Sequence, residues 1–120
     1  MRLLGVVREA FPRLELSLHF PTGAQLIEFV LDTGFEGELA LPARYTHRLG
    51  RPVGTRGWQL ADGGIDQYPL YAAEIDWVDG RRLTTIVELE GNPLTGVELL
   101  TGFHIQIELQ ESGEVIIEPL

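Results

Sequence analysis

The chain has 120 residues, the size of one domain, and 44% of them are apolar, which is enough for a core without covalent cross-links. It contains no cysteine, so disulfides and thiolate metal sites are excluded. The formal net charge is −9 and the basic residues are scattered. Because phosphate binding requires clustered Lys or Arg, nucleic acid and anionic membranes are poor partners.

The N-terminal apolar run, residues 3–7, is interrupted by Arg8 and Glu9 well before it reaches the length of a secretory signal. No stretch of the chain approaches the length of a membrane span. Together with the absence of cysteine, which agrees with a reducing compartment, this predicts a cytoplasmic protein without a membrane partner.

The hydrophobic pattern predicts a mostly β fold in a single domain over residues 1–120. Residues 14–20 alternate strictly between apolar and polar, as expected for a half-buried strand. After a turn at 21–23, a second strand is predicted over 25–31, and its residues become fully apolar toward Asp32. A hairpin that ends at this carboxylate is the simplest interpretation.

The middle of the chain predicts a short strand over 38–42, one or two helical turns over 43–49 and a loop over 50–54. Strands over 55–60 and 65–75 are then joined by Ala61-Asp62-Gly63-Gly64. Asp-Gly is a strong hairpin signal because both residues tolerate positive φ. Further strands are predicted over 83–89, 103–109 and 115–118, with a short helix over 97–100.

The tetrad Leu31-Asp32-Thr33-Gly34 is the most informative motif. A carboxylate at the end of a buried strand is costly unless it is hydrogen-bonded or shares a proton with a partner. Asp-Thr-Gly is also a common turn sequence, so the tetrad by itself is compatible with a purely structural role. A second motif, Pro93-Leu94-Thr95-Gly96, follows downstream and is also succeeded by apolar residues.

These two glycine motifs, with a hairpin midway between them, resemble the retropepsin-like branch of the aspartic proteases, the single-lobe type found in retroviruses and small bacterial relatives. The resemblance implies an acid-protease lobe, a closed β-barrel with one short helix after the second motif. It also implies an aspartic endopeptidase that needs no cofactor. A hairpin at residues 58–67 would be the flap, although a surface hairpin without a special role is the alternative.

Peptide hydrolysis by two carboxylates requires one ionised group to activate water and one protonated group to polarise the carbonyl. Two carboxylates held close together share a proton. This chain supplies only Asp32, because Thr95 occupies the matching place in the second motif. The hypothesis therefore requires a homodimer, as in retropepsins, in which each chain gives one Asp32.

The resemblance assigns the remaining roles. Thr33 would hydrogen-bond across the dyad, and Gly34 would allow substrate to approach closely. The second motif, with Leu94, Thr95 and Gly96, would be structural. The peptide would bind as an added strand under the flap. The expected flap and substrate-binding residues are Trp58, Leu60, Asp62, Gly63, Gly64 and Ile65.

Two questions stay open from the sequence. Phe35 follows Asp-Thr-Gly where a small residue is frequent, and its ring would either narrow the site or lie buried beneath it. The competing function is a non-catalytic module with the same fold that binds a peptide or protein.

The three histidines share no metal-ligand spacing, so no metal is expected, and His19 and His104 are predicted to be exposed.

Overall fold

The computed structural model describes residues 1–59 and 61–120. Within these residues the chain forms ten strands, two short α-helices and one 3₁₀ turn. The elements in chain order are β1 (Leu3–Arg8), β2 (Phe11–Phe20), β3 (Gly23–Leu31), β4 (Leu39–Leu41), α1 (Ala43–Thr46), η1 (His47–Leu49), β5 (Gly54–Gln59), β6 (Ile65–Trp77), β7 (Gly80–Glu88), β8 (Leu94–Thr95), α2 (Val97–Leu100), β9 (Phe103–Ile107) and β10 (Glu114–Pro119).

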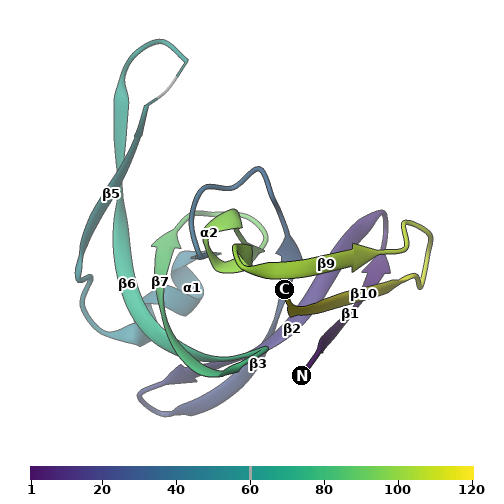
Figure 1. The fold of residues 1–120 in the computed structure, drawn as a ribbon. Helices are drawn as coiled ribbons and strands as arrows, with labels where there is room; N and C mark the ends of the chain where they lie inside the picture. The colour runs from purple at the N-terminus through teal and green to yellow at the C-terminus, as the bar shows by residue number, and fades with distance from the viewer. Residues whose placement is uncertain (60) are drawn as a thin grey trace.

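The strands form one curled sheet in the order β5-β6-β7-β4-β8-β3-β2-β1-β10-β9 (Figure 1). One further residue pair, Leu18 with Ile75, joins β2 to β6 and bends the sheet over the core. A single pair is not a continuous seam of hydrogen bonds, so we describe a curled sheet rather than a closed barrel. The predicted mostly β lobe is confirmed, as is the short helix α2 directly after the second glycine motif.

The core lies inside this curled sheet. On β2, the alternate residues Leu14, Leu16, Leu18 and Phe20 are buried, as the strict alternation of the sequence predicts. They pack with apolar side chains from β3, β6, β7, β10 and α2. Full burial of each such side chain contributes about 1.5–3 kcal/mol, so the core supplies most of the favourable free energy of folding.

Strand β1 was not anticipated from the sequence. It pairs with both β2 and β10, and so ties the N-terminal segment to the C-terminal strand. The turn between β1 and β2 is made by Glu9 and Ala10, whose φ angles are 52° and 69°. Non-glycine residues rarely adopt such angles, and turns of this kind usually contain glycine or asparagine. Because this turn contains neither residue, the sequence pattern did not indicate it.

Two parallel pairings create the crossing that positions Asp32. Strand β8 runs parallel to β3 and antiparallel to β4, so its two residues, Leu94 and Thr95, lie between these strands. Strand β4 in turn runs parallel to β7. The first glycine motif and the second, more than sixty residues apart in the sequence, are therefore neighbours in the sheet.

Strands β5 and β6 form a long hairpin that projects from the body of the molecule (Figure 1). The predicted pair of strands is thus present, and β6 extends further, to Trp77. Its first part is exposed, whereas Tyr71, Ala73 and Ile75 are buried in the body. Strand β6 therefore runs without a break from the projecting hairpin into the core. Leu60 lies outside the described residues.

Two smaller observations complete the comparison with the sequence. His19 was predicted to be exposed, which is wrong: it is half-buried, because its Nε2 lies 2.9 Å from Oδ1 of Asp76 on β6. His104 is exposed, as predicted. Among the helices of the described residues, none has the length and apolar character needed to cross a bilayer.

Candidate functional site

Asp32 follows directly after β3 and is held by backbone hydrogen bonds on both sides. Its N–H donates to the carbonyl of Thr95 at 2.9 Å, and its own carbonyl accepts from the N–H of Phe35 at 3.2 Å. The side-chain Oδ1 accepts from the N–H of Gly34 at 2.9 Å. Asp32 is half-buried, whereas Thr33 and Gly34 are exposed. The loop therefore presents a carboxylate to solvent from a fixed backbone.

Backbone hydrogen bonds connect the second motif to the segment that follows Asp32. Gly96 donates to the carbonyl of Glu38 at 2.8 Å, and Val97 donates to the carbonyl of Phe35 at 3.0 Å. A Cβ atom at Gly96 would lie only 2.3 Å from the carbonyl oxygen of Gly37. Only glycine permits this approach, and α2 begins immediately after it.

Thr95 is fully buried, and its hydroxyl donates to the carbonyl of Val30 at 3.3 Å. Its hydroxyl is thus hydrogen-bonded inside the sheet and is not accessible from solvent. Within residues 1–59 and 61–120, Asp32 is the one acidic residue of the two glycine motifs that meet at this crossing.

The hydrogen bond within the Asp32 turn is not unusual by itself. At the tip of the β5–β6 hairpin, the N–H of Gly64 donates to Oδ1 of Asp62 at the same distance, 2.9 Å. The two turns share the Asp-x-Gly pattern, but the turn at Asp62 is exposed and lies at the end of a hairpin. The crossing with the second motif distinguishes Asp32, as the paired motifs of the sequence indicated.

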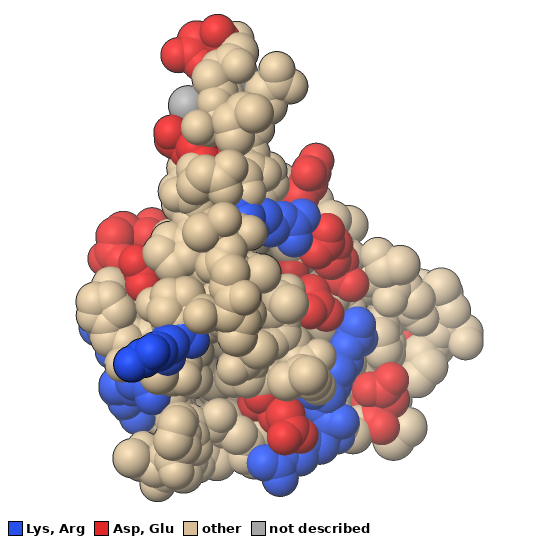
Figure 2. All heavy atoms as spheres, turned by 90° about the vertical axis from the view of Figure 1, so that its left-hand side faces the viewer, with Lys and Arg blue, Asp and Glu red and all other residues tan. Residues whose placement is uncertain are grey.

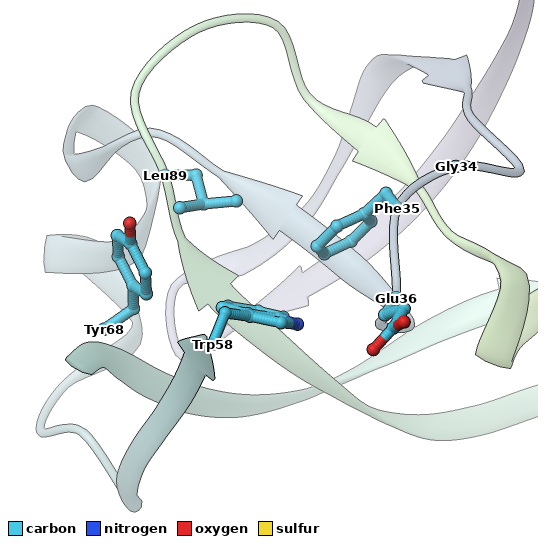
Figure 3. Close-up of a pocket in the computed structure, with 6 residues that line it drawn as sticks. All are labelled: Gly34, Phe35, Glu36, Trp58, Tyr68 and Leu89. Atoms are coloured by element: carbon cyan, nitrogen blue, oxygen red, sulfur yellow. The ribbon is translucent and has the colours of Figure 1, made fainter. Parts of the chain in front are cut away.

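An open pocket of about 340 Å³ lies beside the Asp32 loop (Figure 3). The residues that line it come from the loop, from both strands of the hairpin and from the segment after β7: Gly34, Phe35, Glu36, Trp58, Tyr68 and Leu89. The pocket thus spans the distance between the loop that carries the carboxylate and the base of the projecting hairpin.

Phe35, whose place was uncertain from the sequence, is buried and forms one wall of this pocket. Its ring covers Gly37, where a Cβ atom would lie 2.6 Å from Cζ of Phe35. The Phe35 and Trp58 ring centroids are 6.0 Å apart, and those of Trp58 and Tyr68 are 5.5 Å apart. The bulky ring therefore shapes an aromatic wall next to the carboxylate.

The structure brings only some of the predicted flap residues to this pocket. Trp58 lines it, whereas Asp62, Gly63 and Gly64 are exposed at the hairpin tip, and Ile65 is 66% exposed and not part of the lining. In the hairpin register Trp58 lies opposite Asp66, so these two side chains are on the same face. Ile65 is adjacent to Asp66 in the strand, so its side chain is on the opposite face.

Sequence reasoning missed Glu36, Tyr68 and Leu89. The hairpin register contains the signal for Tyr68: Arg56 lies opposite Tyr68 and Trp58 opposite Asp66. These four side chains share one face because residues two apart on a strand point the same way. Leu89 follows directly after β7, and no local sequence pattern indicates that it lines the pocket.

An ion pair joins this face of the hairpin to α2. The two terminal guanidinium nitrogens of Arg56, Nη1 and Nη2, donate to the carboxylate of Glu98 at 2.9 and 2.8 Å. The hydrogen bond from Arg56 holds the pKa of Glu98 below its usual range, despite partial burial. The same bond raises the pKa of Arg56. The Arg56 guanidinium also lies over the ring of Trp58, 4.9 Å from its centroid.

Within residues 1–59 and 61–120, no three His, Cys, Asp or Glu side chains are grouped so that they could hold a metal ion. At the crossing, the Asp32 carboxylate lies next to the exposed Thr33 and beside the partly aromatic pocket.

The chain is similar in fold to a solved protein, described as a retropepsin-like aspartic protease from Rickettsia conorii. The superposition has a TM-score of 0.65 and covers 98% of this chain and 89% of the other, with 16% sequence identity. At this identity the likeness establishes the fold. No protein-family profile and no curated protein sequence matches the chain.

Proposed function

We propose that the chain is an aspartic endopeptidase that works as a homodimer, with one Asp32 from each copy. The observation that carries the proposal is the placement of Asp32. It is a half-buried carboxylate at the crossing of two glycine motifs, in a fold similar to that of a retropepsin-like protease. One chain holds a single such carboxylate, and a two-fold dimer supplies the second.

In this proposal the two Asp32 carboxylates share one proton and hold a water molecule between them. The ionised carboxylate takes a proton from the water, whose oxygen attacks the scissile carbonyl carbon. The protonated carboxylate donates to the carbonyl oxygen, which gives a tetrahedral diol. As the C–N bond breaks, the proton taken from the water passes to the leaving nitrogen, and the diol returns the other proton to the dyad as the new carboxyl group forms. Thr33, exposed beside Asp32, is the group that would hydrogen-bond across the dyad.

The hairpin of β5 and β6 is the proposed flap. Its position next to the Asp32 loop, with the pocket at its base, supports a role in holding substrate (Figure 3). An extended peptide would lie along the loop as an added strand and place alternate side chains toward the pocket. Closure over the peptide would exclude water other than the one that reacts.

The experiment is cleavage of a diverse peptide library by the wild type and by Asp32→Asn, at high protein concentration and from mildly acidic to neutral pH. Asp79→Asn is the matched control, because Asp79 is exposed in the turn between β6 and β7. We expect cleavage by the wild type and by the control. Loss of general acid–base catalysis should lower the rate of Asp32→Asn by at least about 100-fold.

The oligomeric state is measured in the same samples by sedimentation. A dimer that cleaves no peptide would contradict the proposal and favour the alternative, a binding module that keeps the fold. Equal cleavage by the wild type and Asp32→Asn would also contradict it, because the activity would then come from another site or a contaminant.

A further inference from the structure

We propose that the pocket between Phe35, Trp58 and Tyr68 selects a basic side chain, Arg or Lys, of the peptide substrate. This inference rests on the proposed function and names the substrate class for it. The pocket begins at Gly34, two residues from Asp32. A side chain that enters it therefore belongs to a residue close to the scissile bond.

The walls of the pocket suit a cation on a long aliphatic stem. Three aromatic rings lie in sequence along it, with centroid distances of 6.0 Å from Phe35 to Trp58 and 5.5 Å from Trp58 to Tyr68. Aromatic faces attract ammonium and guanidinium groups, by about 0.5–2 kcal/mol according to how far the cation is desolvated. Trp58 already makes one such cation–π contact, with the guanidinium of Arg56, which lies 4.9 Å from the ring centroid.

The charges around the pocket favour the same ligand. Glu36 lines the pocket (Figure 3). Among the described residues its carboxylate makes no hydrogen bond or close ion pair, although its charge, after the hydrogen bond to Glu98, helps to raise the pKa of Arg56. The two arginines of this region are already neutralised, Arg56 by Glu98 and Arg82 by Glu38. An incoming cation would thus meet a carboxylate, that of Glu36, which no other described side chain contacts directly.

The hairpin adds to this negative field. The hydroxyl of Tyr68 donates to the Asp66 carboxylate at 3.3 Å, and partial burial together with the charge of Asp66 raises the pKa of Tyr68. Acidic side chains also lie at the projecting end of the hairpin (Figure 2). An acidic substrate residue would be repelled here, and an apolar one would leave Glu36 desolvated without compensation.

The test uses otherwise identical alanine-rich peptides whose central residue is Arg, citrulline, Lys, norleucine or Glu. Citrulline keeps the shape of Arg without its charge. Binding to the Asp32→Asn protein is read from tryptophan fluorescence. The chain has two tryptophans, of which Trp77 is buried in the core and Trp58 lines the pocket. The signal therefore reports on Trp58, and Asp32→Asn/Trp58→Phe should lose it.

We expect the Arg and Lys peptides to bind about tenfold more tightly than the citrulline and norleucine peptides, and the Glu peptide to bind most weakly. Glu36→Gln, added to Asp32→Asn, should remove most of this difference. Glu15→Gln on β2 is the control, because Glu15 is exposed and does not line this pocket. Equal binding of the Arg and citrulline peptides would overturn the inference.

Library cleavage separates this inference from the proposed function. Cleavage by the wild type with no preference for a basic residue near the cut would overturn the pocket's selectivity and leave the peptidase intact. Charge-dependent binding that Glu36→Gln abolishes, without any cleavage by the wild type, would support the pocket and overturn the peptidase.

Discussion

Arg56 on β5 donates hydrogen bonds to both carboxylate oxygens of Glu98 on α2, at 2.9 and 2.8 Å. This pair joins the base of the projecting hairpin to the helix that follows the second glycine motif. The hairpin and the Asp32 loop are thus linked through α2, whose N-terminal residues Val97 and Glu98 donate backbone hydrogen bonds to Phe35 and Gly37.

A double-mutant cycle with Arg56→Gln and Glu98→Gln should show a coupling energy of about 0.5–1 kcal/mol at neutral pH. The value lies at the upper end for surface pairs because the contact is bidentate, and it stays small because the Glu98 side chain is 46% exposed. Urea denaturation of the four proteins measures it. A coupling energy of zero would show that the pair does not hold the hairpin.

The same coupling should vanish in acid. The pKa of Glu98 is lowered in the folded state by the hydrogen bond from Arg56, relative to its ordinary value of 4.5. The stabilisation is therefore fully present above that ordinary value and is lost as the pH falls through the lower, folded-state pKa. Repeating the cycle below that folded-state pKa separates this pair from other carboxylates, since their titration is common to all four proteins.

Gly96→Ala should destabilise the fold by about 3 kcal/mol, because the new Cβ atom would meet backbone atoms that cannot move aside. It would lie 2.3 Å from the carbonyl oxygen of Gly37 and 2.7 Å from that of Phe35. The urea midpoint measures the loss. Gly54→Ala is the matched control: its Cβ atom would meet nothing within 4 Å, so its stability should stay near that of the wild type. Equal stability of both variants would contradict the close packing of the two motifs.

Mixing experiments test the proposed requirement for two Asp32 carboxylates. Refolding the wild type together with an equal amount of Asp32→Asn should reduce the activity to about half, because mixed dimers take up wild-type chains. Asp79→Asn added in the same way should not reduce it. Unchanged activity after co-refolding with Asp32→Asn would mean that each Asp32 acts without the other, and would contradict the shared dyad.

Local patterns account for much of the fold. The alternation over residues 14–20 predicts the buried face of β2, and Asp62-Gly63 predicts the hairpin turn, because both signals act over a few residues. Strand β1 was not predicted, because the turn that follows it consists of Glu9 and Ala10 at positive φ and contains no typical turn residue.

The sequence by itself determined that one carboxylate, Asp32, follows an apolar strand in a Gly-bearing turn, and that a second glycine motif without an acid lies downstream. Only the tertiary structure decided that Gly96 packs against the Asp32 loop and that Phe35 is buried. It alone also placed Glu36 and Tyr68 in the pocket beside Trp58. The physical reason is range: strand periodicity and turn chemistry are local, whereas the pocket depends on strands that meet across the sheet through long-range pairing.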